Sequence, residues 1–164
     1  MNVSRRVTST VAKSVAGRVT DTGGYSVPPT PSAPSFTSDP EITGNTWVGE
    51  LLTVSNGTAT GYPSAVITYQ WKRDTVSISG ATSNTYTLQV ADDTTDITCT
   101  VTRTNSEGSD SATSAAVGPI KTKPANTVAP AITGSTSVDS ELTCSTGTWT
   151  GTATITYSYQ WYAD

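Results

Sequence analysis

The chain has 164 residues, of which 34 are Thr and 21 are Ser, while only 13% are charged, the formal net charge is −4 and His is absent. So many hydroxyl and β-branched residues are typical of strands and turns rather than helices. Without His the chain lacks the usual general base near neutral pH and the commonest metal ligand, which excludes Ser-His-Asp, Cys-His and His-metal chemistry. We therefore expect no enzyme, no cofactor and no metal site.

The first 20 residues are basic and carry a regular stripe of valines. They hold four bases and no acid, whereas the rest of the chain holds five bases and thirteen acids. Valine recurs at every fourth position. In a helix, successive valines would be offset by only about 40° around the axis, and in a strand they would all lie on the same side. Both conformations therefore remain open. We expect an anchor that orders on a partner or on copies of itself, with a disordered, solvated start as the alternative. The expected anchoring residues are Val3, Arg5, Arg6, Val7, Val11, Lys13, Val15, Arg18 and Val19.

The same segment argues against several other partners. No apolar run of about 18 residues occurs, so we expect no membrane span. Four dispersed bases without interleaved aromatic side chains are a weak nucleic-acid signature, and we expect no nucleic-acid partner. Lys13 and several hydroxyl residues interrupt the only stretch that resembles a secretory signal, so we expect no export signal.

Residues 21–39 are predicted to be a linker. They combine a Gly pair with four prolines, a composition that favours a semi-extended polyproline II segment after Val27.

Residues 40–118 are predicted to fold as one antiparallel β-sandwich. Short β-branched segments recur every 8 to 12 residues between turn signals, as expected for such a fold. The segments are Glu50–Ser55, Ala65–Lys72, Val76–Ser79, Thr85–Val90, Asp96–Arg103 and Ser111–Val117. Period-two alternation predicts which side chains face inward, with Trp71 at the centre of the core. The expected core residues are Leu52, Val54, Ile67, Tyr69, Trp71, Tyr86, Leu88, Ile97, Cys99 and Val101.

A second copy of this unit begins after a short linker, residues 119–129. Residues 130–164 align with residues 40–74 at an offset of 90 without a gap, with 17 identities in 35 positions. A repeat of this length is domain-sized, so the chain is predicted to be a tandem array. The second copy holds only the first part of the domain, and we expect the natural chain to continue past Asp164. The alternatives are a poorly ordered decayed repeat or a half-domain that borrows a partner.

Several motifs resemble the strands of immunoglobulin-like domains. LTVS, ITYQWKRD, NTYTLQVADD and ITCTVTRTNSEG are similar to strands B, C, E and F of that family. The ITG, YQW and T-N-x-x-G motifs more narrowly resemble tandem modules of tailed-phage structural proteins and of bacterial surface proteins. The resemblance implies an all-β fold of tandem Ig-like sandwich modules, preceded by the anchor and the Pro-rich linker.

The two cysteines depart from the pattern of this family. The resemblance implies one Cys on strand B and one on strand F, but the first copy has Val54 and Cys99 at these positions. The second copy has Cys144 on strand B, and its implied partner would lie near position 189. We therefore expect Cys99 and Cys144 to belong to different modules and not to pair with each other.

Two surface features are candidate binding sites. Trp47 and Tyr62 are candidate glycan contacts, because exposed aromatic rings stack on sugars; packing against the surface is the alternative. Asp92, Asp93 and Asp96 form an acidic loop that could hold Ca²⁺, but their spacing lacks the regular pattern of a calcium loop. We expect the loop to be a solvated turn.

These expectations combine into a functional hypothesis. The chain is expected to be a phage virion structural protein, a fibre or decoration protein on the capsid or tail. Residues 1–20 would bind a capsid or tail protein or form a homo-oligomer, by similarity to phage fibres a trimer, and the modules would adhere weakly to a host surface, with glycan as a possible target. The alternative is an adhesin or carbohydrate-binding module on a bacterial cell surface.

Overall fold

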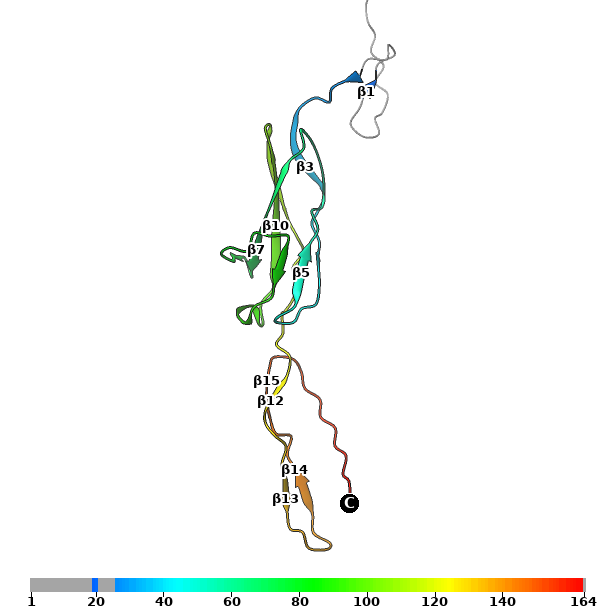
Figure 1. Cartoon of the computed structure of the whole chain (residues 1–164), viewed down its shortest axis with the longest axis vertical. Coiled ribbons are helices and arrows are strands. Elements are labelled where there is room, and N and C mark those ends of the chain that lie inside the picture. Colours follow the sequence, from blue (N-terminus) through cyan, green and yellow to red (C-terminus); the bar gives the residue numbers. More distant parts are fainter. Residues whose placement is uncertain (1–18, 21–25, 164) are drawn as a thin grey trace, which may run out of the picture.

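The computed structural model describes residues 19–20 and 26–163 and consists of strands joined by turns (Figure 1). Every sheet in it is antiparallel, which confirms the all-β prediction. The only helical element in this part of the chain is η1, a single 3-10 turn at Val90–Asp92. At the N-terminal side, β1 (Val19–Thr20) and β2 (Ser26–Val27) form a two-residue ribbon.

Nine strands between residues 32 and 113 form three sheets. A four-stranded sheet has the order β11-β10-β7-β8, a three-stranded sheet has the order β4-β5-β9, and β3 pairs with β6. Each of the six segments predicted within residues 40–118 overlaps one of these strands. Their bounds are β3 Ser32–Ser38, β4 Ile42–Thr43, β5 Leu51–Val54, β6 Thr58–Tyr62, β7 Val66–Arg73, β8 Val76–Ser77, β9 Thr85–Thr87, β10 Ile97–Asn105 and β11 Gly108–Thr113.

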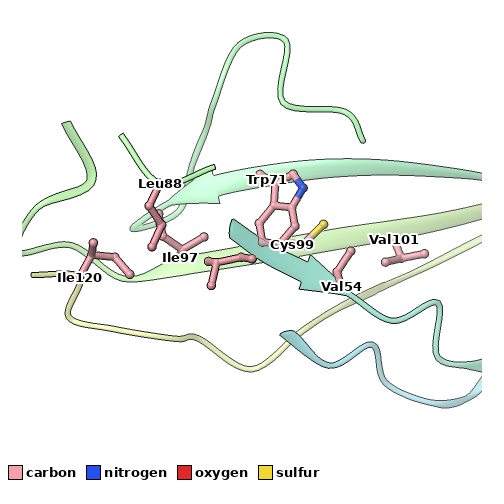
Figure 2. Close-up of a cluster of buried hydrophobic side chains, with 8 residues drawn as sticks. Val54, Trp71, Leu88, Ile97, Cys99, Val101 and Ile120 are labelled. Carbon is pink, nitrogen blue, oxygen red and sulfur yellow. The ribbon is translucent and has the colours of Figure 1, made fainter. Parts of the chain in front are cut away.

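One hydrophobic core lies between the four-stranded and the three-stranded sheet. Figure 2 shows the Trp71 indole beside the sulfur of Cys99, with Val54 of the facing sheet close by. The Trp71 ring stacks on Tyr86 at a centroid distance of 5.6 Å, and its Nε1 donates a hydrogen bond to the Ser83 carbonyl oxygen at 2.8 Å. Of the ten residues that the alternation places in the core, seven are buried and Ile67, Tyr69 and Tyr86 are half-buried against them. The seven are Leu52, Val54, Trp71, Leu88, Ile97, Cys99 and Val101.

The outward row of β10 shows one use of the chain's many threonines. Inward and outward residues alternate along β10, as a strand with one buried face requires. Outward hydroxyls pair across the sheet: Thr100 with Thr113 at 2.9 Å, and Thr102 with Ser111 at 2.8 Å. Such cross-strand pairs stabilise a solvent-facing sheet without ionic charge.

The structure differs from the extended linker predicted over residues 21–39. Residues 32–38 form β3, which pairs with β6 in place of a free polyproline segment. Pro34 is buried, and the pairing register shifts between Ser32 and Ser35. A proline is compatible with a strand at such a bulge, where its missing N–H leaves no ladder hydrogen bond unmade.

Part of the second predicted linker, residues 119–129, also belongs to this core. Ile120 is fully buried, and its amide donates a hydrogen bond to the Thr95 carbonyl oxygen at 2.9 Å. Lys121 is tied by its backbone to Thr46 and Val48. We refer to residues 32–121 as the first unit.

Residues 122–163, the second unit, repeat the first four strands of the first unit in the same register. The pairs Ser35–Thr60 and Ile42–Val54 recur 90 positions later as Ala125–Thr150 and Ile132–Cys144. The strands are β12 Ala125–Val128, β13 Ile132–Gly134, β14 Leu142–Cys144 and β15 Thr148–Thr150. β12 pairs with β15, and β13 with β14.

The same backbone geometry occurs in both copies of the repeat at a pair of glycines. Gly44 and Gly134 have φ values of +132° and +131°, which side-chain-bearing residues rarely adopt. A Cβ at either position would collide with the carbonyl oxygen seven residues further on, at Leu51 or Glu141. Only glycine lets the two strands of this hairpin approach so closely.

We predict that Ile120 is a structural residue of the first unit. Ile120→Ala should lower the free energy of unfolding by about 2–5 kcal/mol, because it leaves a cavity in a packed core. Val76→Ala, at an exposed position of β8, is the control and should change it by less than about 0.5 kcal/mol. Urea unfolding followed by tryptophan fluorescence measures both; equal, small effects would contradict the placement of Ile120 in the core.

Candidate functional site

The predicted anchor lies almost entirely outside the described residues. Val3 to Arg18, the basic and valine positions expected to bind a partner, are not described. For Val19 the structure describes the backbone, which pairs with Val27 in the β1–β2 ribbon. The anchor therefore stays a prediction from the sequence.

The two candidate glycan residues lie at opposite ends of the first unit. Trp47 is half-buried and forms a backbone bridge to Lys121, near the end where β10 begins. Tyr62 ends β6 and precedes Pro63, whose carbonyl oxygen accepts a hydrogen bond from Asn105 at the far end of β10. A strand of this length spans about 26 Å at roughly 3.3 Å per residue. The structure therefore does not bring the two rings into one sugar-binding surface.

The acidic loop is not the solvated turn that was expected, because Asp92 is fully buried. Its carboxylate accepts three hydrogen bonds from the chain: from Arg73 Nε at 2.7 Å, from the Tyr86 hydroxyl at 2.9 Å and from the Gln89 amide at 2.6 Å. These donors satisfy the buried charge, as a carboxylate in a protein interior requires. The prediction of a solvated loop is therefore wrong for Asp92.

The remaining acids of this loop do not join Asp92. Asp93 Oδ1 accepts a hydrogen bond from Thr152 Oγ1 at 2.6 Å, and Asp96 is exposed. Within residues 26–163, no group of three or more carboxylate or thiol side chains is arranged to hold a metal ion. In the same range, no helix is long and apolar enough to cross a membrane.

The ion pair of Arg73 and Asp92 joins three elements at one end of the core. Arg73 is the last residue of β7, and Tyr86 lies on β9. Asp92 is the last residue of η1, and its side chain accepts the amide hydrogen bond of Gln89, the residue just before η1. Burial raises the pKa of Tyr86 to about 12, and its hydrogen bond to Asp92 adds to this rise. The hydrogen bond to Asp92 likewise raises the pKa of Arg73. The cluster is a structural clamp, since the three donors to the Asp92 carboxylate come from β7, β9 and the start of η1 and hold these elements together. An open surface pocket lined by Arg73, Tyr86 and Gln89 lies beside it.

The two thiols are unpaired and differ in environment. Cys99 is buried and Cys144 is half-exposed, and neither forms a disulfide. Burial raises the pKa of Cys99 to about 11, so this thiol is protonated at neutral pH and a poor nucleophile. It packs as a small apolar group in the core, as Figure 2 shows.

Polar contacts tie the second unit to the first. Within the second unit, the Thr122 amide donates to Thr152 Oγ1 at 2.8 Å and the Thr152 amide donates to the Thr122 carbonyl oxygen at 3.1 Å, which fixes Thr152 at the start of this unit. The Thr152 hydroxyl in turn donates to Asp93 of the first unit. An exposed ion pair joins Lys123 to Glu50 at 2.9 Å. We call the two contacts between the units, Thr152 with Asp93 and Lys123 with Glu50, the joint. Lys123 lies within residues 119–129, the predicted linker.

The second unit contains an apolar cavity of about 280 Å³. It opens between the β13–β14 ribbon and the segment that follows β15. The apolar and aromatic residues lining it are Ile132, Cys144, Trp149, Tyr157, Tyr159 and Trp161. The sequence predicts an incomplete core here, because residues 130–164 align with only the first part of the domain, but it does not single out these residues as the lining of a cavity.

Comparison with protein-family models, with curated proteins and with solved structures gives no match for this chain.

We predict that Asp92 contributes strongly to the stability of the first unit. Asp92→Asn should lower the free energy of unfolding by about 3 kcal/mol, because Arg73 then loses its buried counter-charge. Asp39→Asn is the matched control at an exposed position and should have an effect below about 0.5 kcal/mol. Urea unfolding measures the free energy of unfolding of both variants. An Asp92→Asn variant as stable as the control would contradict the role of Asp92 as a structural clamp.

We also predict a pH dependence that comes from Tyr86. The folded state holds the phenol proton up to a pKa of about 12, above the ordinary value of 10. The unfolded state therefore loses its proton first, so stability should fall as pH rises from 10 to about 12. Thermal unfolding measured across this range should show a steeper loss for the wild type than for Tyr86→Phe. Parallel curves for the two proteins would contradict this assignment, since the Cys99 thiol titrates in both.

Proposed function

We propose that this chain is a structural protein of a phage virion that displays tandem Ig-like modules. In this proposal residues 1–20 bind a capsid or tail protein, and the two units project from the particle. The observation that carries it is the repeat of one strand arrangement in the same register at an offset of 90, with a joint of defined contacts between the copies. Such an array extends reach and presents several weak contact surfaces at once.

The strand order of the first unit supports the Ig-like assignment. In such domains strands A, B and E form one sheet and strands C, F and G the other, with an added C′ strand in some members. The three-stranded sheet β4-β5-β9 corresponds to A, B and E. The four-stranded sheet β11-β10-β7-β8 corresponds to G, F, C and C′, and Trp71 lies on the C strand as the family pattern requires.

The surface of the first unit supports a display role over a binding pocket. Its outward sheet face presents paired Ser and Thr hydroxyls. The separation of Trp47 and Tyr62 removes the main support for a carbohydrate-binding module that uses both rings. We therefore favour the virion protein over the bacterial adhesin.

The anchor supplies the assembly step of the proposal. Its valine stripe and its four bases fit an acidic, partly apolar surface on a capsid or tail protein. Association of the same stripe between copies would give a homo-oligomer, for which we propose a trimer.

We predict that deletion of residues 1–20 abolishes association with the particle and leaves the two units folded. Lysates that contain virions and one form of the chain should be separated on a density gradient. The forms are the full chain, the deletion, and a variant with Val3, Val7, Val11, Val15 and Val19 changed to Ser. The full chain should sediment with the particles, and both variants should stay at the top of the gradient, because they lack the apolar stripe. Variants with Thr8 and Thr10 changed to Ser provide the matched control and should sediment with the particles.

Circular dichroism of the purified deletion variant separates loss of anchoring from loss of folding. The spectrum should match that of the full chain in its β-sheet bands. Particle association that survives the deletion would overturn the anchoring role, and full chain found only in the soluble fraction would overturn the virion assignment.

A further inference from the structure

The turn between β5 and β6 contains the single Asn-Gly pair of the chain. Asn56 precedes Gly57, whereas every other asparagine precedes a Val, Thr or Ser. Gly57 has a φ of +59°, and a Cβ there would collide with the Ser38 carbonyl oxygen, so the turn requires glycine. The second unit keeps this glycine as Gly147 but has Thr146 before it. The fold therefore explains the glycine of this pair and leaves the asparagine unexplained.

Two side chains of the four-stranded sheet reach across to this pair. The hydroxyl of Tyr69 on β7 donates a hydrogen bond to Asn56 Oδ1 at 2.5 Å. From β10, Arg103 Nη2 donates to the carbonyl oxygens of Asn56 and Gly57 at 3.0 and 3.1 Å. The guanidinium carbon of Arg103 lies 5.4 Å from the centre of the Phe36 ring, which supports it from one side. Both the side-chain and the backbone carbonyl oxygen of Asn56 therefore accept a hydrogen bond from a residue of the opposite sheet.

Arg103 brings a positive charge to this turn. Among the described residues it forms no ion pair. Asp110, its partner across the β10–β11 pair, accepts the amides of Phe36 and Ser111 with its two carboxylate oxygens. Arg103 Nε is buried and has no hydrogen-bond acceptor within the described part of the chain. The acceptors that the guanidinium contacts are thus the two carbonyl oxygens of the turn.

We propose that Asn56 cyclises with the backbone of Gly57 and loses ammonia, and that Tyr69 and Arg103 promote this reaction. The Gly57 amide gives its proton to water or hydroxide, and its nitrogen attacks Cγ of Asn56 to close a succinimide ring. The bond between Cγ and Nδ2 breaks, and Nδ2 takes a proton from water and leaves as ammonia. Water then opens the ring at either carbonyl and leaves an aspartyl or an isoaspartyl residue at position 56.

Negative charge develops on two oxygens during this reaction, and each of them has a donor. Deprotonation of the Gly57 amide spreads charge onto the Asn56 carbonyl oxygen, which Arg103 contacts. Attack on Cγ moves charge onto Asn56 Oδ1, which Tyr69 contacts. Donors fixed in advance at such oxygens are a main source of rate enhancement. In the described part of the chain no backbone carbonyl accepts a hydrogen bond from the Gly57 amide, so the attacking group is not held elsewhere.

The reaction would change the first unit at one defined place. Each event adds a negative charge beside Asp39 and Glu41, which line the same surface hollow as Asn56. The isoaspartyl form also lengthens the backbone of the turn by one carbon, between the three-stranded sheet and the β3–β6 pair. The modified fraction would increase with the age of the folded chain, because the released ammonia does not return. The inference does not use the role of residues 1–20 or the virion assignment.

The test follows the full chain during incubation at neutral pH, with mass spectrometry of its proteolytic fragments. Asn56 should give a succinimide, lighter by one ammonia, and then the aspartyl and isoaspartyl forms, of which an isoaspartyl methyltransferase labels the last. Asn45 and Asn84 are internal controls and should stay unmodified, because Thr follows each of them. Asn56→Thr, which copies the residue of the second unit, should abolish the signal.

Variants of the two donors test their roles. Tyr69→Phe keeps the ring and removes the hydroxyl, and it should slow the loss of ammonia at least about tenfold. Arg103→Gln should slow it to a similar degree, and Arg103→Lys, which keeps the charge, should retain more of the rate than Arg103→Gln. Tyr62→Phe makes the same chemical change at an exposed position at the other end of β6; its rate should stay within about twofold of the wild type. Circular dichroism checks that each variant is folded.

A measurement on the wild type alone gives a second test. In guanidinium chloride neither donor is held at Asn56, so the native chain should lose ammonia at least about fivefold faster than the unfolded chain. A native chain that reacts no faster than the unfolded one, or does not react, would overturn the proposal. Folded Tyr69→Phe and Arg103→Gln variants that react as fast as the wild type or faster would also overturn it, because these contacts would then restrain Asn56 or leave it unaffected.

Discussion

The closed core of the first unit depends on the packing of β10 between its two neighbours and over the facing sheet. Its inward row covers Trp71 and Leu52, and its backbone pairs with both β7 and β11. A sheet with one apolar face is stable only when that face is covered. Among the described residues of the second unit, which correspond to the first part of this domain only, the matching Trp161 and Leu142 are exposed.

The parts of this fold that could be predicted are those governed by period-two alternation. The strands β5, β7, β9 and β10 and their inward residues follow from it, since each strand buries one face against the other sheet. The tandem arrangement was equally accessible, because the offset of 90 is visible in the sequence and the strand register repeats it. The alternation of apolar and polar residues is sufficient to predict a strand and its inward side chains when the strand buries one face.

Other features depend on contacts between distant segments, and these were missed. Pro34 and its neighbours indicated a linker by composition, but the pairing of β3 with β6 absorbs the proline at a bulge. Asp92 is followed in the sequence by the polar residues 93–96, and only the folded chain brings Arg73 and Tyr86 to its carboxylate. The exposure of Trp161 agrees with the alignment, which places residues 130–164 on only the first part of the domain.

The loop after η1 has a mechanical role that follows from two adjacent residues. Asp92 is held inside the first unit by its ion pair with Arg73, while Asp93 binds Thr152 of the second unit. A pull along the chain from the second unit passes through the backbone at Lys121 and Thr122, while the Thr152–Asp93 contact holds the second unit against a loop that is fixed in the core. Exposed hydrogen bonds contribute about 1 kcal/mol each, whereas cooperative unfolding of a domain requires about 5–15 kcal/mol. Under tension the joint yields first, and the two units can realign with the load while the first unit stays folded.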